Sequence, residues 1–301
     1  YIGVDALGNQ VEVTYDGQPI NVNDLIKDLN DEQKLKQTVI CCMKEIGKKY
    51  PNCGYGTFFQ QWVFEESKPF NSFGNGAAMR VSACGWIAKD LEEVKRLSRL
   101  VTEVSHNHPE GIKGAEATAV AIFLARNASE MDEIRDVIMA NYYNVDFTLD
   151  EIRPNYYFDV SCQGSVPQAL VAFFESTNFE DAIRNAISIG GDSDTIAAIT
   201  GSIAEAYYGI PEDIKAKGLN YLTDEFKNLL NEFNEKIFAG VIISVGINVL
   251  ATCKILPPKA LNTPISYIFF FTVLIEKLIS SINSKEIKTS QFNYRSRNPF
   301  Q

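Results

Sequence analysis

The sequence predicts a compact all-α domain whose functional groups lie on the loops between helices. Apolar residues recur at three- and four-residue steps through most of the chain, and after the first thirty residues almost nothing alternates with period two. The 301 residues can bury a large core, and the apolar share of 46% and charged share of 22% are those of a globular protein.

The first part of the chain, residues 1–33, forms an atypical segment. Residues 10–15 alternate at the period of a strand, and Asp16-Gly17 follows as a turn signal. The chain begins at Tyr1 without an initiator Met or a signal-like apolar run, as expected of a fragment. The helical pattern then occupies residues 34–236, which we predict to be the main domain.

Several helices are predicted in this main part from spacing, caps and stops. Gly47 is expected to end the first helix, and Pro109, capped by Asn107 or His108, to begin a later one. The predicted helix over residues 195–208 is rich in small residues, which favours a central, closely packed helix. The predicted helices span residues 31–46, 58–64, 77–87, 91–103, 112–126, 132–141, 166–175, 178–189 and 195–208.

Residues 237–301 form an apolar extension with a polar tail. Residues 237–253 carry no charge and residues 264–275 are nearly as apolar, yet each falls short of the about 20 residues that span a bilayer. Buried helices, a marginal membrane hairpin and a segment outside the fold all remain open for these runs. The tail from residue 290 is expected to be disordered.

Charge and cysteine content exclude several classes of protein. With 38 acidic and 28 basic residues the net charge is −10, and no basic stripe offers a surface to nucleic acid. The six cysteines have neither CxxC spacing nor a histidine in ligand register, which indicates a reducing, cytoplasmic location. Cys162 alone lies in a polar, glycine-flanked segment, where a buried inert thiol is favoured over a nucleophile.

The most informative segment is Gly190-Gly191-Asp192-Ser193-Asp194-Thr195, which runs into the last predicted helix. Two carboxylates so close repel, and each raises the pKa of the other unless positive charge lies between them. The helix N-terminus supplies part of that charge, and a divalent cation would supply the rest. Oxygen ligands suit Mg²⁺ or Mn²⁺. The competing interpretation is that Ser193 or Asp194 caps the helix.

Three further loops carry groups capable of chemistry. Gly74-Asn75-Gly76 opens a helix and could hold a phosphate, although it could also be a plain turn. His106 and His108 are the two histidines of the chain, and their place before a helix favours capping or ligand hydrogen bonding over metal binding. The polar loop around Gly164 precedes an apolar helix, which it could equally well cap.

The combination of these segments resembles the ADP-ribosylglycohydrolase family, of the dinitrogenase-reductase-activating glycohydrolase and ADP-ribosylhydrolase type. The resemblance covers residues 35–233, and the set of motifs is specific although each member alone is not. The motifs are, in order, Phe73-Gly74-Asn75-Gly76-Ala77-Ala78-Met79-Arg80, Ser105-His106-Asn107-His108-Pro109-Glu110, Gly190-Gly191-Asp192-Ser193-Asp194-Thr195 and Tyr207-Tyr208-Gly209-Ile210-Pro211.

The resemblance implies a multi-helical orthogonal bundle with a central cleft that holds two Mg²⁺ or Mn²⁺ ions. It implies a hydrolase that releases ADP-ribose from a modified protein side chain or another ADP-ribose conjugate, with two metals activating water. By position, the catalytic residues are Asp192 and Asp194, with Thr195 as a further metal ligand. The other roles that the resemblance implies are contacts to the diphosphate for Gly74, Asn75 and Gly76, to the adenosine side for His106 and to the ribose for Gly164.

The N-terminal metal-ligand segment of the family is not matched. Family members have a Gly-Asp-Ala-Leu-Gly-like start, a Thr-Asp-Asp-Thr turn with further metal ligands, and an upstream glutamate. In this chain, Val4-Asp5-Ala6-Leu7-Gly8 partly matches the first of these motifs. Thr14-Tyr15-Asp16-Gly17 matches the Thr-Asp-Asp-Thr turn poorly. Half of the metal site is therefore missing from the sequence pattern.

Three functions follow as hypotheses. The first is a metal-dependent hydrolase of ADP-ribose conjugates. The second is a catalytically silent module that binds ADP-ribose, and the third is a structural relative kept for its fold. A second acidic cluster near Asp192 and Asp194 would favour the first.

Overall fold

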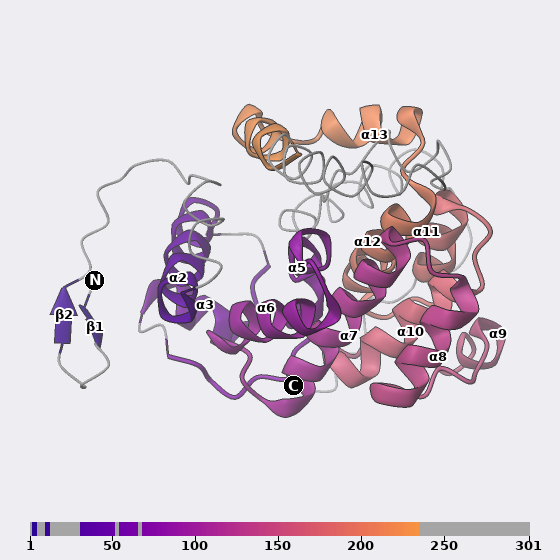
Figure 1. The fold of residues 1–301 in the computed structure, drawn as a ribbon, viewed down its shortest axis with the longest axis horizontal. Helices are drawn as coiled ribbons and strands as arrows, with labels where there is room; N and C mark the ends of the chain where they lie inside the picture. The colour runs from indigo at the N-terminus through magenta and orange to yellow at the C-terminus, as the bar shows by residue number, and fades with distance from the viewer. Residues whose placement is uncertain (1, 5–9, 13–30, 52–53, 66–67, 235–301) are drawn as a thin grey trace, which may run out of the picture.

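Helices make up most of the chain that the structure describes, which confirms the predicted helical fold class (Figure 1). The structure is a computed structural model and describes residues 2–4, 10–12, 31–51, 54–65 and 68–234. Among these, β1 (Ile2–Val4) pairs antiparallel with β2 (Gln10–Glu12), in agreement with the strand-like pattern near residue 10. Asp5, Thr14 and Asp16 lie outside the described residues, as does the apolar extension from residue 237.

The helices follow one another with short connections. They are α2 (Glu32–Lys49), α3 (Thr57–Phe64), α4 (Gly76–Met79), α5 (Ser82–Ile87), α6 (Leu91–Glu103), α7 (Pro109–Arg126), α8 (Met131–Asn141), α9 (Leu149–Ile152), α10 (Cys162–Phe174), α11 (Phe179–Ser188), α12 (Ser193–Tyr208) and α13 (Glu212–Leu219). Residues 224–234 are helical as well. Helices α9 and α13 and this last helix were not predicted from the sequence.

Side-chain caps explain where several helices begin. Asp31 accepts a hydrogen bond from the Lys34 N–H at 3.0 Å, and Asn178 accepts one from Asp181 at 3.0 Å. His108 Nδ1 accepts from the Glu110 N–H at 3.1 Å, which confirms His108 as the cap before Pro109. The unpredicted α9 also has a sequence signal, since Thr148 and Glu151 form a capping box.

Three boundaries differ from the prediction for packing reasons. Gly47 does not stop α2: the helix continues to Lys49, and a Cβ on Gly47 would lie 2.8 Å from Val63 Cγ1, so this glycine allows α3 to approach. The segment predicted as one helix over 77–87 breaks at Arg80 and Val81 into α4 and α5. Finally, α10 begins at Cys162, because Ser161 caps it through the Gly164 N–H at 3.1 Å.

The core is built around α7 and α12, which pack against each other. Helix α12 also packs on α4, α10 and α11, and α7 on α4, α5, α6, α8 and α10. Every residue of α12 from Thr195 to Glu205 is buried, which confirms the predicted central helix of small residues. In Figure 1, α2 and α3 lie at one end of the helical part and α9 at the other.

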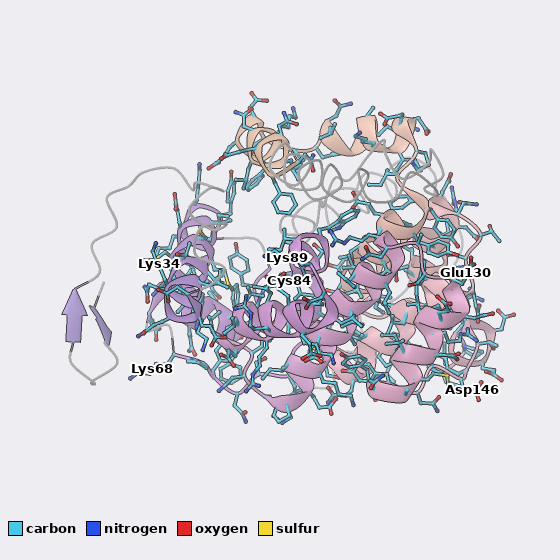
Figure 2. The ribbon with its side chains drawn as sticks, viewed as in Figure 1. Lys34, Lys68, Cys84, Lys89, Glu130 and Asp146 are labelled. Atoms are coloured by element: carbon cyan, nitrogen blue, oxygen red, sulfur yellow. The ribbon has the colours of Figure 1, made fainter. Side chains whose placement is uncertain are left out.

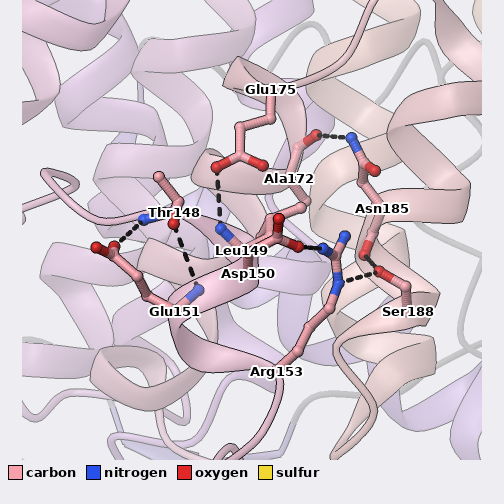
Figure 3. A network of polar contacts seen from close by, with 9 residues as sticks. All are labelled: Thr148, Leu149, Asp150, Glu151, Arg153, Ala172, Glu175, Asn185 and Ser188. Carbon is pink, nitrogen blue, oxygen red and sulfur yellow. Dashed lines mark hydrogen bonds and ion pairs between the residues drawn. The ribbon is translucent and has the colours of Figure 1, made fainter.

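A polar network fixes α9 and the segment that follows it (Figure 3). The Leu149 N–H donates to Glu175 at the end of α10 at 2.9 Å, and Arg153 forms an ion pair with Asp150. Arg153 Nε also donates to Ser188 Oγ in α11 at 3.0 Å. These contacts therefore fix the beginning of the segment 154–161, which leads to the start of α10.

Charged side chains surround this core. Lys68, Glu130 and Asp146 lie at the periphery, whereas Cys84 lies among the central helices (Figure 2). Within the described residues, no helix combines the length and the apolar character needed to cross a bilayer. The predicted cytoplasmic location and the domain boundaries stay predictions.

The contact between α5 and α7 gives a test of this packing. A Cβ on Gly85 would lie 2.7 Å from the Ala119 carbonyl oxygen, and backbone cannot move aside cheaply. We expect Gly85→Ala to lower the free energy of unfolding by about 1–3 kcal/mol in urea titrations. The control is Gly218→Ala in α13, where no atom lies within 4 Å of the added methyl group, and its effect should stay under about 1 kcal/mol in either direction. Equal effects of the two substitutions would contradict the packing described.

Candidate functional site

A cavity of about 610 Å³ brings together segments that lie far apart in the sequence. Its polar lining comes from the glycine–asparagine–glycine bend, from the loop before α7 and from the start of α12; its apolar lining comes from α2, α3 and the segments near residues 70, 158 and 226. The polar residues include Ser72, Asn75, Arg80, His106, Asp192, Asp194 and Thr195, beside Gly74 and Gly76; the apolar ones include Met43, Ile46, Tyr50, Phe58, Phe59, Phe70, Phe158, Val160 and Phe226.

The apolar side of the cavity is where the two ends of the helical domain meet. The rings of Tyr50, after α2, and Phe226, in the last described helix, have centroids 5.4 Å apart. The Tyr50 hydroxyl donates to Glu225 Oε2 at 3.3 Å, and Lys49 Nζ forms an ion pair with the same carboxylate at 2.5 Å. These contacts join the two ends of the domain beside the cavity, which Tyr50 and Phe226 line.

The glycine–asparagine–glycine bend is positioned by backbone pairing with the segment before α10. The Asn75 N–H donates to the Val160 carbonyl at 2.7 Å, and the Cys162 N–H donates to the Phe73 carbonyl at 2.8 Å. The Gly74 N–H donates to Ser72 Oγ at 3.1 Å. The amides of Gly74 and Asn75, which we expected to face a phosphate, thus have partners within the protein.

The Asn75 side chain reaches the acidic turn. Its Nδ2 donates to Asp192 Oδ2 at 2.6 Å and to Ser165 Oγ at 2.9 Å, and all three residues are buried. The bend and the start of α12 are therefore one site, although 117 positions separate Asn75 from Asp192 in the chain. No pattern in the sequence indicated this contact, and Asn75 was predicted to contact the ligand alone.

The capping interpretation of the acidic turn is not supported. Ser193 and Asp194, the two expected caps, lie inside α12; the N-cap position is occupied by Asp192, whose side chain makes no capping hydrogen bond. Burial raises the pKa of Asp192 to about 7, and the neighbouring Asp194 carboxyl raises it as well, while hydrogen bonds from Asn75 and Thr195 act in the opposite direction. A carboxylate in this position requires either a proton or a cation.

The donors present at this turn fit a divalent cation. Asp192, Asp194 and the Thr195 hydroxyl all line the cavity, and carboxylate and hydroxyl oxygens are ligands of Mg²⁺ and Mn²⁺. Within the described part of the chain, however, no group of three or more His, Cys, Asp or Glu side chains could hold a metal. The described residues thus supply a partial ligand set at one position.

Gly164 is connected to the acidic turn through Tyr156. It belongs to the first turn of α10, not to a loop, and it is not among the residues lining the cavity. Its carbonyl accepts a hydrogen bond from the Tyr156 hydroxyl at 2.6 Å. The Tyr156 ring packs against Gly191, where φ is +63° and a Cβ would overlap the ring. Gly164 and Tyr156 therefore support the turn, and the expected contact of Gly164 with a ribose stays a prediction.

His106 lines the cavity and Cys162 does not. His106 is buried beside the Phe70 ring, with centroids 5.4 Å apart, and its pKa is lowered well below its usual value by burial and then by Arg80. Cys162 is buried with its thiol toward the Gly74 carbonyl at 3.3 Å, and burial raises its pKa to about 12. The inert thiol favoured by the sequence is consistent with this environment.

Comparisons with known proteins point to one family. The family model described as ADP-ribosylglycohydrolase matches residues 35–241, more than half of the chain. ADP-ribosylhydrolase ARH3 of Gallus gallus is 29% identical over 223 residues, covering 54% of this chain and 61% of the relative. ADP-ribosylarginine hydrolase Tri1 of Pseudomonas putida (strain GB-1) is 30% identical over 149 residues, covering 46% of this chain and 39% of the relative. The chain thus spans less than two thirds of the length of these relatives. A solved structure titled "ADP-ribosylglycohydrolase-related protein complex" aligns with a TM-score of 0.42 at 20% identity, covering 62% of this chain and 69% of that one.

The raised pKa of Asp192 predicts how stability depends on pH. Between its ordinary value near 4 and about 7 the folded protein holds a proton that the unfolded chain releases, so the free energy of unfolding falls as the pH rises through this range. With EDTA present, we expect Asp192→Asn to be more stable than the wild type by about 1–3 kcal/mol at pH 8, and by much less at pH 4.

Urea titrations at the two pH values measure this difference. The exposed Asp132→Asn serves as the control and should change the free energy of unfolding by less than about 0.5 kcal/mol at either pH. An Asp192→Asn variant that is less stable than the wild type at pH 8 would show that the buried carboxylate is not a destabilising charge.

Proposed function

The chain belongs to the ADP-ribosylglycohydrolase family, and on this premise we propose that it is a hydrolase that releases ADP-ribose from a modified protein side chain or another ADP-ribose conjugate. The observation that carries this proposal is the gathering of the acidic turn, the glycine–asparagine–glycine bend and His106 around one cavity of about 610 Å³. Three of the four motifs that resemble the family thus contribute to a single site.

The proposed reaction needs a cation at the acidic turn. Asp192, Asp194 and Thr195 would hold Mg²⁺ or Mn²⁺, and their oxygen atoms suit such an ion. A bound divalent cation supplies Lewis-acid activation of water and of the sugar oxygens. The two-metal form of the proposal requires acidic ligands beyond those of the described residues.

The residues of the chain have distinct parts in this proposal. Asn75 holds Asp192 through its amide and so orients one carboxylate toward the cavity. Arg80 lies on the same wall and provides positive charge for an anionic diphosphate. The aromatic side chains of Phe58 and Phe70 stack with centroids 6.1 Å apart and offer an apolar surface for a flat ring.

A catalytically silent protein that binds ADP-ribose is the second candidate function. The observation that favours it is the partial ligand set, because two carboxylates and a hydroxyl hold a cation less firmly than a complete site. Binding through the bend, His106 and the aromatic wall does not depend on the missing ligands.

One set of assays separates the candidate functions. Peptides carrying ADP-ribose on arginine or on serine are incubated with the full chain and Mg²⁺ or Mn²⁺, and free ADP-ribose is measured by chromatography. We expect release with the metal and none with EDTA, and a rate at least about 100-fold lower for Asp194→Asn, with Asp132→Asn unchanged as the control. Calorimetric heat with ADP-ribose but no release by the wild type would support the silent binder, and neither heat nor release would contradict both functions.

A further inference from the structure

Arg80 is a buried cation in the wall of the cavity, and it contacts His106 on the side away from the bend. It lies at the break between α4 and α5. Its Nη2 is 2.6 Å from Ser105 Oγ, 3.3 Å from His106 Nδ1 and 3.5 Å from the Thr102 carbonyl oxygen. Ser105 Oγ is in turn 2.9 Å from His106 Nδ1. Two polar groups thus converge on a single ring nitrogen.

The chemistry of these groups decides which nitrogen of His106 carries a proton. A guanidinium group only donates hydrogen bonds, so Nη2 facing Nδ1 requires Nδ1 to accept. Ser105 Oγ accepts from Arg80, and its own hydrogen is then directed to Nδ1. A proton on Nδ1 would instead face the N–H of a cation at 3.3 Å. Nδ1 is therefore the bare nitrogen.

The ring as a whole is neutral. His106 is 6% exposed, and both burial and the positive charge of Arg80 lower its pKa. A neutral imidazole carries one proton, and with Nδ1 bare that proton resides on Nε2.

The surroundings of Nε2 show where this proton points. A Cβ built on Gly74 would lie 3.4 Å from Nε2, and one on Gly76 would lie 3.7 Å from it. Both glycines line the cavity, so the bend leaves room for Nε2 where any other residue would bring a side chain. The edge of the ring that carries the proton lies against the open part of the bend.

We propose that Arg80, assisted by Ser105, is a positioning residue that holds neutral His106 as its Nε2–H tautomer and so makes it a fixed hydrogen-bond donor to an oxygen atom of the ligand. The tautomer itself follows from the protein alone, whereas the identification of that oxygen with a phosphate or hydroxyl of ADP-ribose rests on the proposed function. In this arrangement Nε2 is neither a metal ligand nor a general base, because both roles need its lone pair.

The test reads the tautomer directly. Long-range ¹H–¹⁵N spectra of the uniformly labelled full chain separate a protonated from a bare ring nitrogen, and with two histidines in the sequence His108→Gln completes the assignment. We expect Nε2 protonated and Nδ1 bare for His106 in the wild type at neutral pH. A protonated Nδ1, or an imidazolium, would overturn the proposal.

Variants show whether Arg80 is the cause. Arg80→Met removes the donors and the charge and should produce a detectable Nδ1–H population, whereas Arg80→Lys, which keeps both, should preserve the Nε2–H form. Arg80→Gln replaces Arg80→Met if that variant does not fold, because its amide oxygen can accept from Nδ1. The control is Arg99→Met, which removes an arginine that is exposed and paired with Glu103, and His108 is an internal reference. An unchanged His106 tautomer in the folded Arg80→Met or Arg80→Gln variant would overturn the assigned cause.

Titration calorimetry with ADP-ribose on the same proteins links the tautomer to binding. We expect Arg80→Met to bind about tenfold more weakly and Arg99→Met to bind as the wild type does. A wild type with the Nε2–H tautomer and no affinity for ADP-ribose would overturn the proposed function and leave the tautomer standing. Tight binding of ADP-ribose by a wild type that carries the His106 proton on Nδ1 would overturn the tautomer and leave the proposed function standing.

Discussion

The hydrogen bond from the Asn75 amide to the Asp192 carboxylate holds the candidate site together. It joins a bend about a quarter of the way along the chain to the start of the central helix α12, at 2.6 Å between two buried side chains. A buried acceptor of this kind is costly when unpaired, so the folded state strongly favours arrangements that keep the two segments in contact. The same amide also binds Ser165, which brings the start of α10 to the same point.

The same cavity brings together side chains of opposite charge. The protein as a whole carries a charge of −10, yet its cavity is lined by the cation Arg80 as well as by the carboxylates of the acidic turn. Burial lowers the pKa of Arg80 to about 10, which still leaves it charged at neutral pH. A buried Asp192 carboxylate is stabilised by a cation, so the site combines a group suited to an anion, Arg80, with a group suited to a metal, Asp192.

Much of the fold could be predicted from the sequence because helix periodicity and caps are local signals. The spacing of apolar residues placed α6, α11 and α12 within two residues of their observed bounds, and Pro109 with His108 marked the start of α7. Gly47 was misread as a stop because its role depends on Val63 in another helix. The break at Arg80 was missed for the same reason, since its partners Thr102 and Ser105 come from the end of α6 and the loop after it.

The sequence predicted which residues line the cavity better than it predicted the contacts among them. The cavity contains Gly74, Asn75, Gly76, His106, Asp192, Asp194 and Thr195, all of which the motifs singled out. The contacts among them depend on three-dimensional packing, so no spacing in the sequence revealed that Asn75 reaches Asp192 or that Tyr156 supports Gly191. Gly164 was expected in a loop before a helix and lies instead in the first turn of α10.

The contact of Tyr50 with Phe226 has a thermodynamic consequence. Because these rings line the cavity and come from opposite ends of the helical domain, an occupant would touch the first and the last described helices at once. Fraying of either terminal helix would then cost the contacts of the occupant as well as those of the protein. A ligand bound in the cavity would therefore couple the stability of α2 to that of the last described helix. Unfolding of the two helices would become more cooperative through ligand binding alone.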